Sequence, residues 1–249
     1  MAIYLKKFEN HTQYENYING SSAILPNVSI CTTEGDVHYN PYVDPYAGHE
    51  FVDLGLSVKW AKMNIGANSE TDYGQYFQWG DISGYTASQV GSGEGQKYFG
   101  WADYKYSNNG GSSASDMTKY NSTDGKTTLE VGDDAAVANM GGLWRMPTAE
   151  EFNELCTAST ITKSWTNVNG VNGYKFSLTA DPTKYVFFPA AGYCSSGNVY
   201  IVGSDGYYWS SSLYTNNVTN SRYLRFNSGI CGIDSYFRRN GYSVRGVVG

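Results

Sequence analysis

Few residues of this 249-residue chain combine the types and spacing that catalysis requires. Its three histidines, His11, His38 and His49, all lie near the start of the chain, and none is close in sequence to another candidate ligand. The sequence has no phosphate-binding loop, dinucleotide fingerprint, HExxH zinc motif or GxSxG nucleophile elbow. We therefore expect no catalytic residues, and we expect each histidine to occupy a surface or turn position.

Acidic residues provide only weak candidates for metal ligands. Asp116 and Asp124 lie in a polar stretch and could hold a structural Ca²⁺, because loop oxygens are the usual ligands of that ion. Their spacing is irregular, however. Glu150, Glu151 and Glu154 fall in the first turns of a predicted helix, where the positive end of the helix dipole favours carboxylates. We expect no cofactor, with a structural Ca²⁺ as the open alternative.

Cysteine spacing gives little support to a metal site or a redox motif. Cys31, Cys156, Cys194 and Cys231 include no CxxC pair, and four cysteines would make a sparse disulfide framework at this length. Cys231 has arginines near it, which could lower the pKa of its thiol. An incidental cysteine is the alternative.

Charge is unevenly distributed along the chain. The net charge is -6, yet residues 210–249 contain five of the six arginines and only one acid, Asp234. The acidic body argues against nucleic-acid binding. The basic end could face an anionic glycan or an acidic protein patch, or some of its arginines could be structural. The N-terminus lacks an apolar signal core and no apolar stretch could span a membrane, so we expect a soluble protein without an ordinary signal peptide.

Two regions with different local patterns are expected to position these residues. Residues 1–48 predict a helix at Thr12–Asn19, a hairpin with strands near Val28–Thr32 and Asp36–Asn40, and a linker at Pro41–Gly48. This small N-terminal region could serve for attachment and for homo-oligomer formation. The main domain is expected over residues 49–249.

The main domain reads as strands, then helices, then a run of strands, which is the α+β class. Residues 82–125 are rich in Gly, Ser and Tyr and predict a long loop insert. A capping box at Thr148 predicts a helix with Phe152, Leu155 and Cys156 on one face. The other predicted elements are a helix at Asp133–Asn139 and strands at Val52–Trp60, Tyr73–Trp79, Tyr174–Leu178, Tyr185–Pro189, Gly206–Ser210, Arg222–Phe226 and Tyr242–Val248.

Several segments of the main domain together resemble one known family. They are FVDLGLSVKWAKMNIGA (51–67), DYGQYFQWGD (72–81), GGLWRMPTAEEFNEL (141–155), VNGYKFSL (171–178), VFFPAAGY (186–193), YYWSSS (207–212), RYLRFNSG (222–229) and GYSVRGVV (241–248). In this order they resemble the Fibrobacter succinogenes major paralogous domain family over roughly residues 50–249. The resemblance implies a C-type-lectin-like fold related to formylglycine-generating enzyme, with two short helices, mostly antiparallel strands and long loops.

The same resemblance bears on the cysteines. Met63 stands where that family often has Cys, which weakens any disulfide to Cys156 carried over from relatives. The position of Cys231 is polar and variable in the family pattern, so we predict a free, exposed thiol there.

The chain also resembles the variable proteins of diversity-generating retroelements, and its opening is similar to surface proteins of Bacteroidales phages. Adenine-directed mutagenesis in such systems never produces Lys, Glu, Gln, Met or Trp. These five types occur 37 times in residues 1–209 and are absent from residues 210–249. The resemblance implies a diversified binding surface between roughly Tyr207 and Asn240. Its predicted ligand-binding residues are Tyr214, Asn216, Arg222, Tyr223, Arg225, Asn227, Ile230, Cys231, Asp234, Tyr236, Phe237, Arg239 and Asn240.

Strand periodicity separates scaffold from surface within this region. Leu224 and Phe226 should point inward, and Tyr223 and Arg225 should point outward. We expect a non-enzymatic receptor-binding or ligand-binding protein, in a phage tail within the virion or at a cell surface as an adhesin. Its partner would be a bacterial surface protein or glycan. No EPN or WND motif indicates a calcium-dependent sugar site.

Two other functions stay open. A copper-dependent thiol oxidase like formylglycine-generating enzyme would need reactive thiols, and Cys194 and Cys231 are the candidates. A structural surface module without a defined ligand is the other alternative.

Overall fold

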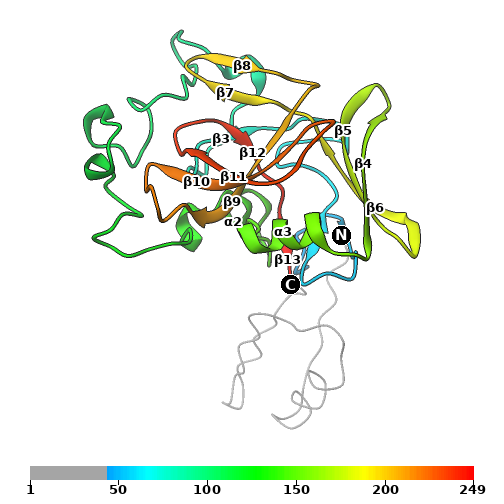
Figure 1. The fold of residues 1–249 in the computed structure, drawn as a ribbon. Helices are drawn as coiled ribbons and strands as arrows, with labels where there is room; N and C mark the ends of the chain where they lie inside the picture. The colour runs from blue at the N-terminus through cyan, green and yellow to red at the C-terminus, as the bar shows by residue number, and fades with distance from the viewer. Residues whose placement is uncertain (1–43) are drawn as a thin grey trace, which may run out of the picture. The chain divides into compact units, whose positions relative to one another are not determined.

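The computed structural model describes residues 44–249. The helix expected at Thr12–Asn19 and the hairpin expected at residues 28–40 lie outside the described residues. The chain divides into two compact units, Met1–Gly48 and His49–Gly249. The second unit is an α+β domain made mostly of antiparallel sheet (Figure 1).

Four sheets form the domain in the part of the chain that the structure describes. The central sheet has five strands in the order β11 (Cys231–Phe237), β10 (Asn220–Phe226), β9 (Gly206–Leu213), β12 (Tyr242–Ser243) and β3 (Tyr76–Phe77). A second sheet joins β1 (Phe51–Val52), β2 (Lys59–Ala61) and β13 (Val247–Val248). The meander β4 (Ile161–Val168), β5 (Val171–Leu178) and β6 (Asp181–Pro189) stands at one side, and the hairpin of β7 (Tyr193–Ser195) and β8 (Asn198–Tyr200) at another (Figure 1).

Two α-helices begin where side chains cap their first turns. At α3 (Ala149–Thr157), Oγ1 of Thr148 accepts from the Glu151 N–H at 3.2 Å, and Glu151 accepts from the Thr148 N–H at 2.8 Å. This confirms the predicted capping box. At α2 (Ala135–Met140), the Asp134 carboxylate accepts from two N–H groups of the first turn. Phe152, Leu155 and Cys156 are buried, as the helical spacing predicted.

Aromatic side chains from both helix and sheets form the main core. Trp60 lies 5.2 Å from Phe152 and 5.8 Å from Phe188, measured between ring centroids. Phe226 stacks on Tyr208 at 5.7 Å. Burying side chains of this size stabilises a fold by roughly 2–3 kcal/mol each, so this cluster holds α3, β6, β9 and β10 together.

Two of the five C-terminal arginines are structural. Arg245 is fully buried and donates at 2.9 Å to Asn64 Oδ1, to the Ala61 carbonyl and to the Phe187 carbonyl. Burial lowers the pKa of Arg245 to about 10. Arg238 is also buried, and its Nη1 donates to the carbonyls of Lys119 and Tyr120. The basic end therefore presents less charge to solvent than its composition suggests.

Several predicted strands differ from those observed. The prediction of one strand over Val52–Trp60 is wrong, because a turn separates β1 from β2. The strand expected at Tyr73–Trp79 is reduced to β3. The strand expected at Tyr242–Val248 divides into β12 and β13, with Arg245 between them turned into the core. Strands β4, β7, β8 and β11 were not predicted.

The insert at residues 82–125 is a loop, as predicted, with short 3-10 turns η1 (Ala87–Gln89), η2 (Asn108–Gly110) and η3 (Ala114–Asp116). A fourth turn, η4 (Val131–Asp133), precedes α2. The carboxylate of Asp133 accepts from Lys105 at 2.9 Å, Lys119 at 2.5 Å and the Tyr120 hydroxyl at 2.6 Å. The Asp133 carboxylate therefore anchors the insert residues Lys105, Lys119 and Tyr120 to the segment that precedes α2.

Each of the two insert carboxylates considered as Ca²⁺ ligands accepts local backbone hydrogen bonds. Asp116 accepts from the Ser113 N–H at 2.9 Å, and Asp124 accepts from the Tyr120 N–H at 2.7 Å. Over residues 44–249, no group of three or more His, Cys, Asp or Glu side chains is arranged to hold a metal ion. The same residues include no helix of the length and apolarity needed to cross a membrane.

Candidate ligand-binding face

Strand β10 separates buried scaffold from the opposite face of the central sheet. Leu224 and Phe226 are fully buried, as predicted. Tyr223 lies on the other face, opposite Trp209 of β9 and Asp234 of β11. In the same way Arg225 lies between Tyr207 and Gly232. This face therefore carries alternate residues of three neighbouring strands.

Packed aromatic rings cover the middle of this face. The Tyr223 ring stacks on Tyr207 at 5.6 Å and lies 4.8 Å from Tyr242 and 5.8 Å from Trp209. Tyr223 is only 3% exposed. The prediction of an exposed Tyr223 is therefore wrong, because neighbouring rings cover the face toward which it points. Burial, together with the nearby Asp234 carboxylate, raises the pKa of Tyr223, so its hydroxyl is neutral at physiological pH.

The β7–β8 hairpin adds two further rings. Its strands are joined at Ser196 and Gly197, which both have positive φ, as tight hairpin turns require. The hairpin pairs Tyr193 with Tyr200, whose rings stack at 5.2 Å. Tyr193 also meets Tyr207 edge to face at 5.1 Å. The hairpin therefore extends the packed rings of the central sheet outward.

Two tyrosines on this side of the domain are exposed to solvent. Tyr200 is 39% exposed, and Tyr236 on β11 is 47% exposed. Tyr236 lies two residues after Asp234 on β11, so it points to the same face as Asp234, the cross-strand neighbour of Tyr223. We call the set Tyr193, Tyr200, Tyr207, Tyr223 and Tyr236 the tyrosine face. Its inner rings are fixed by packing, and its outer rings can contact a ligand.

A polar group borders the tyrosine face at Arg225. The guanidinium lies 5.7 Å from the Tyr207 ring, and Nη2 donates to Asp205 Oδ1 at 3.3 Å. Asn227 Nδ2 donates to the same oxygen at 3.1 Å. Arg225 Nε is buried and has no hydrogen-bond partner. Asp205 thus holds both side chains at one edge of the face.

Arg239 borders the other side. Its Nη1 donates to the Phe99 carbonyl and to Ser195 Oγ, both at 2.9 Å. The guanidinium lies 5.6 Å from the Phe237 ring and 6.0 Å from the Trp101 ring. Half-buried and anchored through one nitrogen, Arg239 presents an aromatic-flanked cation beside the tyrosine face.

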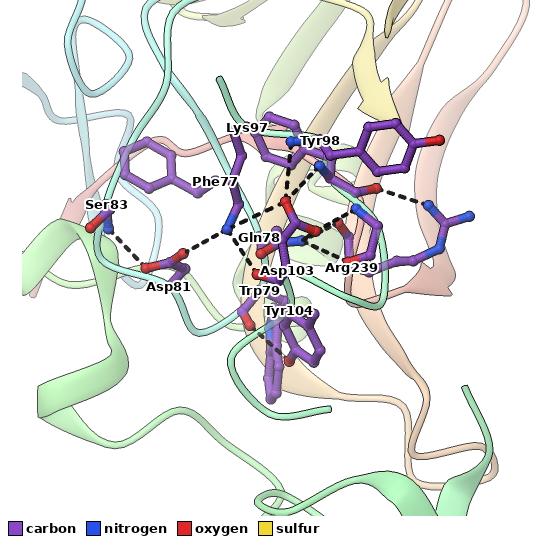
Figure 2. Close-up of polar contacts among 12 residues, drawn as sticks. Phe77, Gln78, Trp79, Asp81, Ser83, Lys97, Tyr98, Asp103, Tyr104 and Arg239 are labelled. Carbon is purple, nitrogen blue, oxygen red and sulfur yellow. Dashed lines mark hydrogen bonds and ion pairs between the residues drawn. The ribbon is translucent and has the colours of Figure 1, made fainter. Parts of the chain in front are cut away.

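The loop next to Arg239 is fixed by one carboxylate (Figure 2). Asp103 accepts from the N–H groups of Tyr98, Phe99 and Gly100 at 3.1, 2.9 and 2.6 Å. Lys97 donates to the Asp103 carbonyl at 3.0 Å. These hydrogen bonds fix the position of the Phe99 carbonyl, which accepts a hydrogen bond from Arg239.

Gln78 joins this loop to the end of β11. Its Nε2 donates to the Arg239 carbonyl at 2.8 Å and to the Gly100 carbonyl at 3.3 Å (Figure 2). The side chain is almost fully buried. Hydrogen bonds to the backbone carbonyl of Arg239 and from its guanidinium therefore fix this residue from two sides.

The structure distributes the thirteen predicted ligand-binding residues over several places. At or beside the tyrosine face lie Tyr223, Arg225, Asn227, Asp234, Tyr236, Phe237 and Arg239. Tyr214, Asn216 and Arg222 gather at the β9–β10 turn, where the Arg222 guanidinium lies 5.5 Å from the Tyr214 ring. Ile230 is exposed in the β10–β11 turn.

Besides Tyr223, two predicted residues do not face solvent as expected. Asn240 is 1% exposed and its Nδ2 donates to the Tyr242 hydroxyl. Cys231 is half-buried, and its Sγ lies 3.3 Å from Cys156 Sγ. The prediction of an exposed Cys231 thiol is therefore wrong, because alternation along β11 turns this side chain toward α3 and the core.

Sequence reasoning missed Trp101, Tyr193, Tyr200, Tyr207 and Asp205. All five precede residue 210, and four of them meet the face through contacts with residues at least 14 positions away in sequence, whereas Tyr200 joins it through its hairpin partner Tyr193. The abundance of Tyr was visible, but it did not indicate which tyrosines would pack together.

Residues 157–247 match a family described as a domain of unknown function, DUF8237. This region extends from the end of α3 to β13 and includes the tyrosine face. Among curated proteins and among solved structures, none matches the chain.

Proposed function

We propose that this chain is a non-enzymatic receptor-binding or ligand-binding protein with a C-type-lectin-like fold, and that the tyrosine face is its binding surface. One observation carries the proposal: more than half of the predicted ligand-binding residues lie on or beside one face, together with the half-buried Tyr193 and the exposed Tyr200 of a separate hairpin. The proposed ligand is a protein or glycan on a bacterial surface. The proposed setting is a phage tail or a surface adhesin.

The chemistry of the face suits recognition. Tyr supplies a large contact area at low entropy cost, because it has only two χ angles. Stacking against buried neighbours fixes these rings before a ligand arrives, which reduces the cost of binding. Tyr and Arg are also the residue types most often found as binding hot spots. Tyr236 and Arg239 are of these two residue types, and both side chains are at least partly exposed to solvent.

The fold proposal is supported by how the motif segments meet. The Arg245 side chain of GYSVRGVV bonds to Asn64 and Ala61 of the first motif and to Phe187 of VFFPAAGY. Trp209 of YYWSSS stacks on Tyr242 at 4.1 Å and donates to the Phe77 carbonyl of DYGQYFQWGD at 2.8 Å. Motifs far apart in sequence thus form one connected interior, which is what a shared fold would require.

Diversification is supported by the position of β11. This strand is at the edge of the central sheet, and its Asp234 and Tyr236 side chains are exposed. Together with the absence of Lys, Glu, Gln, Met and Trp from residues 210–249, this placement suits a segment that changes between variants. We propose that the chain is a variable protein of a diversity-generating retroelement in a Bacteroidales phage.

The proposal is tested by binding of fluorescently labelled protein to a panel of Bacteroidales cells and to a glycan array. Tyr200→Ala and Tyr236→Ala should each weaken binding about 30-fold, the effect of a hot spot worth roughly 2 kcal/mol. Leu143→Ala is the control, because Leu143 is 51% exposed on the loop between α2 and α3. Protease or periodate treatment of the cells distinguishes a protein from a glycan ligand. Binding that survives both tyrosine substitutions would refute the assignment of the face.

A further inference from the structure

Two cysteines that are distant in sequence meet beneath the candidate binding face. Cys156 lies in the last turn of α3 and Cys231 is the first residue of β11, 75 residues later. Their sulfurs are 3.3 Å apart. Cys156 is buried in the main core, and Cys231 packs against the same cluster. The rigid helix and the sheet edge hold both thiols in place.

We propose that Cys156 and Cys231 form an intramolecular disulfide when the protein meets a small oxidised disulfide such as oxidised glutathione. The bridge would tie edge strand β11 covalently to α3. This inference rests on the geometry of the two thiols and not on ligand binding by the tyrosine face.

The reaction balances as two thiol–disulfide exchanges. The Cys231 thiol loses its proton, and its sulfur attacks one sulfur of oxidised glutathione, which breaks the glutathione S–S bond and releases one reduced glutathione. The Cys156 thiol then loses its proton and its sulfur attacks Cys231 Sγ. This step forms the protein S–S bond and releases the second reduced glutathione. The protein loses two electrons and two protons, and one glutathione disulfide gains them.

Access and charge favour Cys231 as the first sulfur to react. It is half-buried, whereas Cys156 is buried. The contact with the Cys156 thiol lowers the pKa of Cys231, and the Lys163 ammonium acts in the same direction, although burial opposes both. Lys163 is held nearby because its Nζ donates to the Cys156 carbonyl. The contact with Cys231 and burial raise the pKa of Cys156, so we expect Cys156 to react second.

The bridge would change how the sheet edge is held. β11 pairs with β10 on one side only, because it is the last strand of its sheet. A disulfide from its first residue would fix the end of the strand next to the exposed β10–β11 turn. It would also close a long loop in the unfolded chain, which stabilises the folded state.

The test is peptide mapping without reduction after incubation of the whole protein with excess oxidised glutathione. We expect a linked Cys156–Cys231 peptide, loss of alkylation at both residues, and an upward shift of the thermal midpoint by several degrees. Cys194→Ser is the matched control: Cys194 is buried in a different cluster, so this variant should still form the bridge and show the shift.

Cys156→Ser and Cys231→Ser should both abolish the linked peptide and the thermal shift. In Cys156→Ser, Cys231 should instead accumulate as a glutathione adduct. Three results would overturn the proposal in the wild-type protein: a glutathione adduct on Cys231 with Cys156 still alkylated after denaturation, a bridge to Cys31 or to a second chain, or no oxidation of either thiol.

Discussion

The burial of Tyr223 leads to a sharp prediction about stability. Strand alternation alone would make Tyr223→Ala a surface change, costing less than about 1 kcal/mol. In the structure its ring is packed among Tyr207, Trp209 and Tyr242. Removing it opens a cavity between three rings, so Tyr223→Ala should lower the free energy of unfolding by much more.

The magnitude follows from what the ring contacts. Truncating a buried aromatic side chain to Ala costs roughly 3–5 kcal/mol. This cost already includes the aromatic pairs that the ring makes, each worth about 0.5–1.5 kcal/mol, and Tyr223 takes part in three such pairs. We expect a loss of about 4 kcal/mol. Tyr223→Phe keeps the ring and removes only the hydroxyl near Asp234, so it should cost about 1 kcal/mol.

Urea unfolding followed by circular dichroism measures both variants against wild type. Tyr236→Ala is the matched control, because it removes the same ring from a position 47% exposed on the same face. It should change the free energy of unfolding by less than about 1 kcal/mol. If Tyr223→Ala lowered the free energy of unfolding no more than Tyr236→Ala does, the Tyr223 ring would not be packed among its three aromatic neighbours. The inner rings of the tyrosine face would then not be fixed by packing.

Three further outcomes are expected. Arg245→Met should lower the free energy of unfolding by roughly 3 kcal/mol in urea denaturation, because it leaves three buried acceptors without donors, while Arg222→Met should cost under about 1 kcal/mol. Burial opposes ionisation of Asp133, but hydrogen bonds from lysines and tyrosines outweigh it and hold its pKa well below the usual value. Asp133→Asn should therefore lower the thermal midpoint at neutral pH, and the gap from wild type should narrow as pH falls below about 4; a constant gap would contradict this. Sequencing the locus should reveal a reverse transcriptase gene and a near-copy of the codons for residues 223–240, differing mainly at template adenines; differences scattered over all four bases would refute diversification.

Local signals predicted the parts of the fold that depend on neighbours in sequence. The capping box at Thr148 and Glu151 set the start of α3, because both partners lie within one turn. The alternation of Leu224 and Phe226 predicted which face of β10 is buried. The long insert was recognisable because Gly, Ser and Asn interrupt any period.

Contacts between distant segments could not be predicted in the same way. Alternation predicted that Tyr223 and Leu224 point to opposite faces of the sheet. It did not show that Tyr207 and the hairpin tyrosines cover the face to which Tyr223 points. β11 was missed because Gly, Asp and Ser interrupt its apolar residues, so that CGIDSYF contains no long apolar run. Arg238 and Arg245 could not be separated from surface arginines, because their hydrogen-bond acceptors lie more than 50 residues away in sequence.

The pairing of β11 with β10 has a consequence for how freely its sequence can change. The ladder runs without interruption from Asn220 opposite Phe237 to Phe226 opposite Cys231. Its hydrogen bonds join main-chain groups, which every residue except proline supplies equally. Side chains such as Asp234 and Tyr236 can then be exchanged while the strand keeps its path. Because backbone pairing holds β11 in place, the strand can carry side chains of many chemistries without a change in the framework.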